Sequence, residues 1–586
     1  TISIGDLCLT SDPNILWIGT GEHNARNSVS WGDGVYKSAD AGKTWKHMGL
    51  KESFQIGRIA AHPKNPEIAY VGALGRLWGP NEQRGLYKTV DGGKTWEKIL
   101  HVDENTGCAD VALDPRDPNT ILAAMHQRRR GEFDVNDPVK RWGPGGGLYR
   151  STDGGRTWKR LTDGLPACQI GRIGLRWSPS QIGHAFALIE TEQIGTAPPG
   201  SKFPAFMGIQ GGNAEEGALL TKVNPKSPAH KAGLKRGDVI RAINGKPVAN
   251  QDDMVQLIRK FHAGDEVTIR AVRDKKETLE LKLTFGKRPG TPGGKRPFGG
   301  VLGGQIANVH EQQGEQGFQT GGLYKSTDAG ETWTRINSLN PRPFYYSQIH
   351  VDPSDENYIS VLGIRFHHSS DGGKTFDTNA GRGIHPDHHA MWINPRDGRH
   401  WILGGDGGLY VTHDRGANWE FIDDLPIGQF YDVGVDNRTP YRVYGGLQDN
   451  GTWGGPSALR GSHGPTAADW FLVGWGDGFL CRADPHDPDL IYFESQYGGM
   501  SRVHLRTGER IRIRPPQKKD VRYRFNWKTP LLLSHHNSRI FYAAGDMVFR
   551  SINRGEDLRP ISPNITRTDQ GSATALTESP LNPDVL

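Results

Sequence analysis

This sequence has few cysteines, no long apolar run and no initiator methionine. The chain has four cysteines and no CxxC pair, which excludes a disulfide framework and a cysteine-based zinc site: Cys8, Cys108, Cys168 and Cys481. No apolar run approaches the roughly 18 residues that a membrane-spanning helix needs. The chain starts at Thr1 without a signal peptide, and a removed targeting segment would account for this.

The positive charge belongs to one segment of the chain, which has no long run of basic residues. The formal net charge is +6. Residues 203–296 hold 18 Lys and Arg against 10 Asp and Glu, a local charge of +8, so the remainder carries −2. Nucleic-acid binding requires a basic stripe on one surface. We therefore expect no nucleic-acid partner, and no motif for a cofactor is present.

Glycine and tryptophan are abundant, with 78 and 16 copies, whereas only 35% of the residues are hydrophobic. Many short strands joined by tight turns, with aromatic side chains between the sheets, have this composition. The chain is also too long for one compact core, so we expect repeats or several domains.

A ten-residue string, here called the Asp box, recurs along the chain. Four copies are nearly identical: YKSADAGKTW (36–45), YKTVDGGKTW (87–96), YRSTDGGRTW (149–158) and YKSTDAGETW (324–333). Weaker copies are HHSSDGGKTF (367–376), YVTHDRGANW (410–419) and FRSINRGEDL (549–558). Each copy predicts a strand, a turn and a strand. The aspartate would accept hydrogen bonds from turn amides, and the aromatic residue would pack between sheets.

The spacing of the boxes predicts the number of sheets. A second turn, rich in Pro, Asp and Asn, lies upstream of each box, so one unit has four strands, the size of a propeller blade. Asp328, Asp371 and Asp414 follow one another at 43 residues, and the 139 residues from Asp414 to Asn553 fit three blades, two of them without a box. This predicts nine blades and an incomplete tenth that begins at ATALTESPLNPDVL.

The Asp boxes resemble those of sortilin-like and BNR-repeat proteins, which include sialidases, xyloglucanases and photosystem assembly factors. The likeness is greatest to large secreted bacterial proteins with sortilin-like propellers, and it covers nearly the whole chain outside one insert. It implies an all-β propeller of about ten four-stranded blades and an exported protein that is periplasmic, cell-surface or extracellular. It implies little about activity, because the box recurs in proteins of unrelated function.

The insert lies between Asp153 and Asp328, which are 175 residues apart, far more than one blade requires. Within it, SPAHKAGLKRGDVIRAINGKPV resembles the PDZ domain of bacterial periplasmic proteases. We expect propeller blades at 1–191 and 321–586 and an inserted α+β PDZ domain at 203–287. The flanks, 192–202 and 288–320, are rich in Pro, Gly and basic residues and predict flexible tethers.

The likeness to PDZ domains implies a peptide-binding groove. Four residues match the loop whose backbone amides capture a terminal carboxylate: Phe206, Met207, Gly208 and Ile209. The strand that follows would accept a peptide by β-augmentation. The helix at 252–260 matches the groove wall, and three of its residues either line the side-chain pocket or belong only to the core: Met254, Leu257 and Ile258. We expect a peptide C-terminus as partner, with an internal segment or the host propeller as alternatives.

The two ends of the strands differ in their connections. The first-to-second turn and the Asp-box turn are short and lie at one end, whereas the long, variable connections lie at the other. Binding residues usually lie on variable loops of a rigid scaffold, so we place the functional face opposite the Asp boxes. Candidate binding residues there are Glu22, Trp78, Glu82 and Arg84.

Acidic residues follow the second strand in several blades: Glu22, Asp406, Asp449, Glu494 and Asp546. Such carboxylates could bind a cation or sugar hydroxyls, or supply an acid–base pair for glycoside hydrolysis, with Asp406, Asp449 and Glu494 as candidate catalytic residues. The alternative is that they cap turns or pair with nearby arginines. The carboxylate pair of a xyloglucanase cannot be aligned here, and the FRIP signature of sialidases is absent.

The densest histidine cluster is HPDHHAMW (385–392), which precedes the first strand of a blade. His385, Asp387 and His388 could ligate a divalent metal ion at the channel mouth. No fourth ligand is identifiable, and loop histidines more often bond to the backbone, so we predict no metal site.

Together these patterns favour an exported, non-catalytic binding or scaffold protein. Its propeller face would hold a protein or a glycan, and its PDZ domain a peptide C-terminus. Two binding modules on one chain raise avidity through effective concentration. The alternatives are a glycoside hydrolase of xyloglucanase type and an assembly factor for an exported complex.

Overall fold

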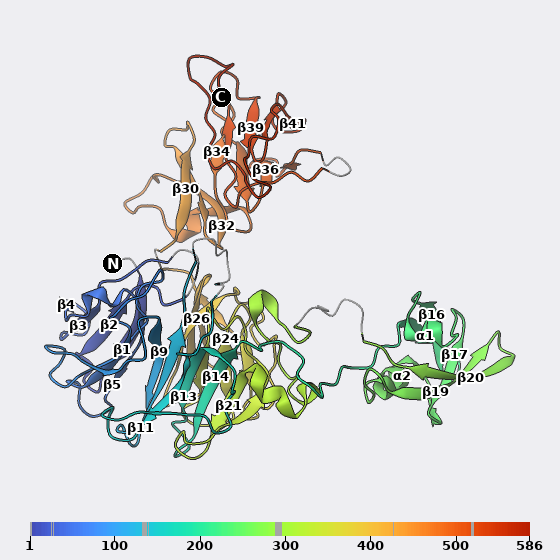
Figure 1. The fold of residues 1–586 in the computed structure, drawn as a ribbon. Helices are drawn as coiled ribbons and strands as arrows, with labels where there is room; N and C mark the ends of the chain where they lie inside the picture. Colours follow the sequence, from blue (N-terminus) through green and yellow to red (C-terminus); the bar gives the residue numbers. More distant parts are fainter. Residues whose placement is uncertain are drawn as a thin grey trace. The chain divides into compact units, whose positions relative to one another are not determined.

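The structure, a computed structural model, describes residues 3–24, 26, 29–131, 138, 140–287, 296–425, 427–516 and 521–586. Strands make up most of its regular elements (Figure 1). It contains two compact units, Thr1–Leu403 with Thr412–Trp419 and Gly404–Val411 with Glu420–Leu586, and each is described by itself. Within the described residues, every helix falls short of the length and apolar content of a membrane span.

The first unit opens with three antiparallel four-stranded sheets, in which strands consecutive in sequence are neighbours. The first contains β1 (Ile4–Leu9), β2 (Leu16–Thr20), β3 (Val35–Ser38) and β4 (Lys46–His47). After the short helix η1 (Lys51–Ser53), the second contains β5 (Ile56–Ala61), β6 (Ala69–Ala73), β7 (Gly85–Thr89) and β8 (Glu97–Leu100). The third contains β9 (Thr106–Leu113), β10 (Ile121–Gln127), β11 (Gly147–Ser151) and β12 (Lys159–Arg160).

The fourth sheet is interrupted in sequence but continuous in space. It contains β13 (Ile170–Trp177), β14 (Ala185–Thr191), β21 (Gly322–Ser326) and β22 (Thr334–Asn337). β14 pairs directly with β21, with Ile189 opposite Gly322. A three-stranded sheet of β23 (Gln348–Val351), β24 (Ile359–Leu362) and β25 (His367–Ser369) follows. The next sheet contains β26 (His388–Ile393), β27 (Trp401–Gly405), β28 (Gly408–Thr412) and β29 (Glu420–Ile422).

Three further four-stranded sheets make up most of the second unit. The first contains β30 (Phe430–Val435), β31 (Arg442–Leu447), β32 (Gly451–Pro456) and, after η5 (Ala467–Asp469), β33 (Phe471–Gly474). The second contains β34 (Cys481–Ala483), β35 (Leu490–Ser495), β36 (Gly499–His504) and β37 (Arg510–Ile513). The third contains β38 (Leu531–Leu533), β39 (Phe541–Ala544), β40 (Val548–Ser551) and β41 (Arg559–Pro560).

A separate α+β fold lies between β14 and β21 in sequence. Its sheet has the order β15 (Ile209–Asn213), β16 (Ala218–Val223), β17 (Val239–Ile243), β19 (Glu266–Arg273) and β20 (Glu277–Thr284), and β18 (Lys246–Pro247) pairs with β17. Two helices accompany it, α1 (Pro228–Lys231) and α2 (Gln251–Ile258). Asn250 caps α2 by accepting a hydrogen bond from the Asp253 amide at 2.9 Å. Its core is its own, with Met207, Met254 and Phe285 buried in one cluster.

The hydrophobic cores of the first unit lie between successive sheets. Trp17 of β2 packs with Ile56 of β5 and Tyr87 of β7, and Tyr70 of β6 packs with Val111 of β9. The first strands β1, β5, β9, β13, β23 and β26 contact one another in that order. This radial packing of four-stranded meanders is the architecture of propeller blades.

The all-β fold with an α+β insert is confirmed. The described residues form nine sheets of the blade type, eight with four strands and one with three, as the box spacing predicts. The two sheets without a box fall at β30–β33 and β34–β37, between Asp414 and Asn553. Residues 572–586, where an incomplete tenth unit was expected, contain no strand.

Part of the segment expected to be a tether is folded. Residues 296–320 contain three short helices: η2 (Val301–Gly303), η3 (Glu311–Gln313) and η4 (Glu315–Thr320). Buried Gln305 accepts a hydrogen bond from the Gly195 amide at 2.8 Å and donates one to the Ser338 carbonyl at 2.7 Å. The Gln313 amide group donates to the Gln305 side chain at 3.1 Å. Composition suggested flexibility here, but these buried amide bonds hold the segment to the fourth sheet.

Candidate functional site

The repeated aspartate closes its own turn. The Asp91 carboxylate accepts hydrogen bonds from the Thr95 amide at 3.0 Å and the Thr95 hydroxyl at 2.7 Å. The Thr89 hydroxyl donates to the same carboxylate at 2.8 Å and accepts from the Gly93 amide at 2.9 Å. Five other boxes repeat this arrangement, at Asp40, Asp153, Asp328, Asp371 and Asp414. In the last box, where Asn553 replaces the aspartate, Asp557 accepts from the Ser551 hydroxyl instead.

The Asp-box turn also bonds to the first-to-second turn of its own sheet. The Ala41 amide donates to the Asn14 carbonyl at 3.0 Å, and the Gly92 amide donates to the Glu67 carbonyl at 2.9 Å. Equivalent bonds join Gly154 to Asn119, Gly183 to Ala329, Gly372 to Asn357, Arg415 to Arg399 and Arg554 to Arg539. Both turns therefore lie at one end of each sheet and are hydrogen-bonded to each other. This favours the opposite, variable end as the place of ligand contacts.

Carboxylates on the first strands join neighbouring sheets of the first unit. Arg58 of β5 lies between Asp110 of β9, at 2.8 Å, and Asp6 of β1, at 3.4 Å. The second oxygen of each carboxylate accepts an amide of the next sheet, from Ile59 at 2.7 Å and from Leu175 at 2.9 Å. These charges are paired and serve to hold the sheets together.

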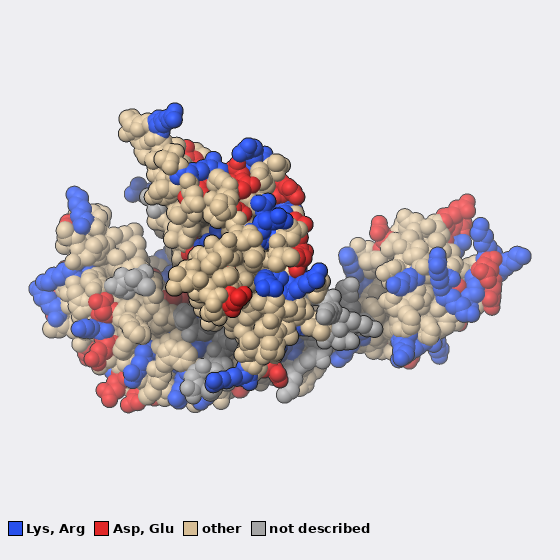
Figure 2. Space-filling view, turned by 90° about the horizontal axis from the view of Figure 1, so that it is seen from above, with Lys and Arg blue, Asp and Glu red and all other residues tan. Residues whose placement is uncertain are grey.

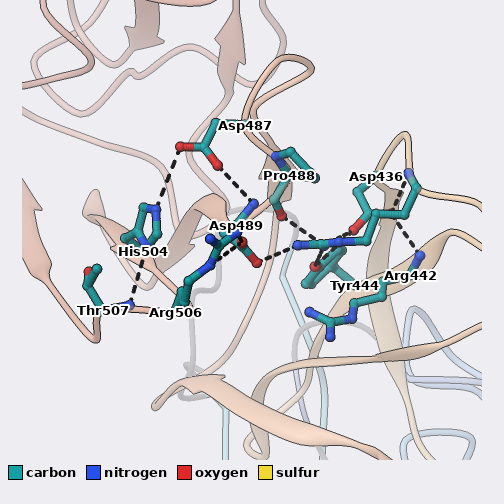
Figure 3. Close-up of polar contacts among 10 residues, drawn as sticks. Asp436, Arg442, Tyr444, Asp487, Pro488, Asp489, His504, Arg506 and Thr507 are labelled. Carbon is teal, nitrogen blue, oxygen red and sulfur yellow. Dashed lines mark hydrogen bonds and ion pairs between the residues drawn. The ribbon is translucent and has the colours of Figure 1, made fainter.

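A second paired network lies in the second unit, beside the turns that follow β30 and β34 (Figure 3). Arg438 forms ion pairs with Asp436 and Asp489, and it donates to the Pro488 carbonyl at 3.0 Å. The Tyr444 hydroxyl donates to Asp436 at 3.3 Å, and Arg506 pairs with Asp489 at 2.6 Å. Each acid here has a basic or hydroxyl partner, so this network locks two sheets and leaves no charge for a ligand.

The four predicted binding residues at the variable end of the first unit have different environments. Trp78 and Glu82 are exposed, and Trp78 pairs with Arg130 as an isolated bridge. Arg84 is fully buried and donates to the carbonyls of Leu74 and Arg76. Glu22 is half-buried. Burial raises its pKa, opposed by the Ser30 amide and by arginines that include Arg128.

Arg128 is the residue that sequence reasoning missed. It directly follows β10, is buried, and bonds to the His23 carbonyl at 3.4 Å and to the Gln55 side chain. Burial lowers the pKa of Arg128, and repulsion from Arg84 and Arg172 adds to the effect. The sequence does contain a signal for this residue: three arginines, Arg128–Arg130, directly follow a strongly apolar strand. Such a charged run marks the point where the strand ends.

The three candidate catalytic carboxylates lie in the second unit. Glu494 has no exposed surface, and its Oε2 accepts the Thr529 amide at 3.0 Å. Burial raises the pKa of Glu494 to about 8. Asp449, in a left-handed conformation with φ +60°, donates its amide to Asp477 at 2.9 Å. The Asp406 carbonyl accepts the Asn450 side-chain amide at 2.8 Å.

Asp546 and the histidine cluster have local partners. Asp546 forms an ion pair with Arg524 at 3.5 Å, which is the arginine pairing that the sequence left open. Asp387 accepts a hydrogen bond from the Tyr346 hydroxyl, and the His385 ring nitrogen lies 2.8 Å from the Pro386 carbonyl oxygen. His388 is buried at the start of β26. Over the described residues, no three His, Cys, Asp or Glu side chains come close enough together to hold a metal ion.

The inserted fold presents an open strand edge next to a helix. β15 is the edge strand of its sheet, paired on one side with β16 and in contact with α2. Gly208, at φ +82°, sits so close to Ser227 that an added Cβ would lie 2.2 Å from the serine Cβ. Met207 and Gly208 each accept a bond through their carbonyls, from Ala229 and Asn224. Among the described residues, neither of their amides donates to a protein acceptor.

The residues predicted to line this groove are divided between core and surface. Met254 is buried in the core, and Leu257 and Ile258 pack partly against it. Val255, which the sequence analysis did not name, is half-buried without being part of that core. Gln251 lies one turn before Val255, and its side chain approaches the Gly211 backbone of β15. Gln251 and Met254 are therefore the α2 side chains that approach β15 at Gly211.

Basic and acidic side chains are interspersed on the face drawn in Figure 2, including the part formed by the inserted fold. That face of the described residues has no continuous stripe of one sign.

Comparison with known proteins supports this division of the chain. Residues 205–283 match the family model described as PDZ domain, and residues 33–184 match the one described as sortilin, neurotensin receptor 3. A probable periplasmic serine endoprotease DegP-like from Marinomonas sp. is 38% identical over 76 residues, which is 13% of this chain and 16% of that protein. The periplasmic serine endoprotease DegP of Escherichia coli is 31% identical over 105 residues, 17% of this chain and 22% of that protein.

Among solved structures, an ancestral GH74 enzyme aligns with 94% of this chain and 75% of its own, at 16% identity and a TM-score of 0.31. The matches to the two DegP-type proteases named above cover less than a quarter of the length of those proteins. Residues 205–283 form a PDZ domain, and it is inserted into an all-β chain of blade-type sheets whose residues 33–184 are sortilin-like.

Proposed function

We propose that this chain is a non-catalytic binding protein whose PDZ domain captures the C-terminal end of a peptide. The observation that carries the proposal is the open edge of β15, which lies against α2. The two residues before β15, Met207 and Gly208, have amides that donate to no protein acceptor among the described residues. A peptide strand placed there would pair with β15, and its terminal carboxylate would accept bonds from the loop that Met207 and Gly208 form.

The side chain of the last peptide residue would enter between Met207, Ile209 and Val255. All three are apolar, and Met207 is buried while Val255 is only half-buried. An apolar last residue therefore fits this pocket best. Gln251, with donor and acceptor atoms at the start of α2, would contact a polar side chain further along the peptide.

The variable end of the second unit supports a further binding surface for a protein or a glycan. Trp475 is 78% exposed and Tyr497 57% exposed, and both lie on connections at that end. Gln496, directly before Tyr497 in sequence, donates to Asp477, two residues after Trp475, at 2.5 Å. Exposed aromatic faces beside hydrogen-bonding groups are typical of recognition surfaces for both ligand classes.

A glycoside hydrolase is the weaker candidate. Its acid would need a raised pKa, and burial gives Glu494 one of about 8. Glu494 is nevertheless fully buried and bonded to the Thr529 amide, which is the environment of a structural carboxylate. Release of reducing sugar from any plant or bacterial polysaccharide by the purified chain would reverse this preference.

We infer that the protein acts outside the cytoplasm. Its PDZ relatives include periplasmic proteases, and sortilin-like sequence precedes the PDZ domain. A role in assembling an exported complex is compatible with peptide capture, and co-purification of a defined partner from the producing cell would distinguish it.

The test of peptide capture uses the full chain and a C-terminal peptide array, followed by fluorescence anisotropy with the best peptide. We expect binding to a free carboxylate and a loss of affinity of at least about 30-fold when the same peptide ends in an amide. Val255→Glu should weaken binding by a similar factor, because it places a charge in the apolar pocket.

Gln256→Glu serves as the matched control for Val255→Glu, since Gln256 is exposed on the same helix. It should leave the affinity within about twofold. Equal affinity for the amidated and free peptides would refute capture of a terminus. No binding to any peptide of the array would refute the PDZ half of the proposal.

A further inference from the structure

Three buried arginines meet at the variable end of the first unit and are here called the arginine cluster. Arg84, Arg128 and Arg172 are 0%, 2% and 5% exposed. Arg84 donates to the Leu74 carbonyl, and Arg128 donates to the adjacent Gly75 carbonyl at 3.4 Å. The guanidinium groups of Arg84 and Arg128 therefore bond to the same loop, the connection that follows β6.

All hydrogen-bond acceptors of the guanidinium groups in the arginine cluster are uncharged. Besides Leu74 and Gly75, they are the carbonyls of His23, Arg76, Gly79, Phe344 and Tyr345 and the Gln55 side chain. No carboxylate oxygen of the described residues lies within 4.0 Å of a guanidinium nitrogen of Arg84, Arg128 or Arg172, although Glu190 accepts the backbone amide of Arg172 at 3.2 Å. The Nε atoms of Arg84 and Arg128 are buried and have no partner among these residues.

Two other arginines of this chain show the alternative arrangement. Arg58 lies between Asp6 and Asp110, and Arg438 between Asp436 and Asp489. A buried guanidinium group without a carboxylate loses hydration and gains no compensating charge. Within the described residues, the guanidinium groups of the arginine cluster therefore lack the directly bonded carboxylate that the other two sites have.

The electrostatics of the surroundings agree with this deficit. Burial, then repulsion from Arg84 and Arg172, lowers the pKa of Arg128 well below its ordinary value. Burial lowers the pKa of His126 to about 3, and Arg128 adds to the effect. Glu190 is fully buried, and burial raises its pKa to about 7. Asp110 and Glu190 oppose the lowered pKa of Arg172, Asp103 that of Arg84 and Glu22 that of Arg128, but in each arginine the effect of burial is larger.

We propose that the arginine cluster binds the compact oxyanion group of a ligand, a carboxylate or a phosphate or sulfate. A guanidinium group presents a planar set of donors that matches two oxygens of such a group. Arg84 and Arg128 each keep an unpartnered Nε–H for it. The site lies at the variable end of the first unit and is independent of the PDZ groove.

The test measures the melting temperature of the full chain at constant ionic strength in a low-chloride buffer. Acetate and glucuronate represent carboxylates, and phosphate and sulfate represent the inorganic oxyanions. We expect at least one class to raise the melting temperature saturably, by about 2–4 °C, and to give a measurable dissociation constant by calorimetry. The class that binds more tightly identifies the source of the oxyanion.

Arg128→Met carries the second half of the test. It should abolish the saturable shift and, because repulsion is relieved, raise the melting temperature in the absence of anion. Arg438→Met is the matched control: it removes an arginine that is already paired, so it should lower the melting temperature and keep the anion shift. Arg84→Gln replaces Arg128→Met if the latter fails to fold.

Two outcomes would overturn the proposal. One is a shift that does not saturate or persists in Arg128→Met, which is the general effect of excluded salts. The other is an Arg128→Met protein destabilised like Arg438→Met, which makes Arg128 a structural hydrogen-bond donor. A third experiment tests the acids of segment 132–137, which lies outside the described residues, as an alternative source of negative charge. If only the chain with Glu132→Gln, Asp134→Asn and Asp137→Asn responds to anions, the counter-charge belongs to the chain itself and the proposal fails.

Discussion

At the residue scale, the Asp-box aspartates show how far a local pattern can be interpreted. Each accepts hydrogen bonds from a residue four positions later, so every partner lies within the ten-residue string. These bonds favour the ionised carboxylate. The Thr44 and Thr95 hydroxyls lower the pKa of Asp40 and Asp91 to about 2 from an ordinary 3.8.

A pH dependence of stability follows. Because the folded-state pKa lies below the unfolded value, the boxes stabilise the fold fully above about pH 4, and this contribution is lost as the pH falls towards 2. Asp91→Asn should lower the melting temperature at pH 7 and flatten its decline between pH 4 and 2. Circular dichroism melts across this range measure both effects.

The control for this experiment is Asp569→Asn, an exposed aspartate outside any box. It should leave the melting curve unchanged at pH 7. A decline between pH 4 and 2 that is equally steep in Asp91→Asn and the parent chain would contradict the assignment to the boxes.

Other residues show where single-residue reasoning stops. The sequence placed Glu494 among candidate catalytic acids because it follows a strand, yet the structure buries it against the Thr529 amide of another connection. Arg128 was not selected at all, because its importance depends on Arg84 and Arg172 from different sheets. Contacts between residues this far apart in sequence leave no local pattern.

At the element scale, α2 illustrates the same limit. Its helical character follows from the Asn250 cap and the apolar spacing, and the sequence located it to within two residues. Which apolar residues face the groove does not follow, because Met254 and Val255 are both compatible with an amphipathic helix. Only the position of β15 beside the helix shows that Gln251 and Met254 approach the strand.

The network around Arg438 predicts how strongly two sheets of the second unit depend on one ion pair. Arg438→Met leaves the fully buried Asp436 carboxylate without its cation. We expect the free energy of unfolding to fall by about 2–3 kcal/mol. This is less than the usual cost of breaking a buried ion pair, because the Arg438 side chain is partly exposed. Urea unfolding followed by tryptophan fluorescence measures this change.

Arg506→Met is the comparison for this prediction. Arg506 pairs with the same Asp489, but its side chain is 80% exposed. Its removal should cost no more than about 0.5 kcal/mol. Equal losses for the two variants would mean that the network does not lock the sheets.

At the scale of the whole molecule, the PDZ domain is an insertion that the host sheet tolerates. β14 and β21 pair directly on either side of it, and its entry and exit meet at the Phe206–Gly286 bridge, with reciprocal bonds of 3.0 Å. Insertions whose ends lie this close disturb the host least.

Replacing residues 206–286 by Gly-Ser-Gly should therefore remove the PDZ domain without unfolding the rest. We expect an unchanged melting transition of the blade-type sheets, retention of the anion response and complete loss of peptide binding. Differential scanning calorimetry and anisotropy measure these outcomes. Loss of the main transition would show that the host sheets depend on the inserted domain.

The sequence alone determined the all-β fold, the number of blade-type sheets and the PDZ insertion. These depend on hydrogen bonds and turns that close within ten residues and on strand periodicity repeated in each unit. The tertiary structure alone decided which charges are paired, which acids are sealed from solvent and which face of α2 is open. Those properties depend on burial, and burial is set when side chains from different sheets meet.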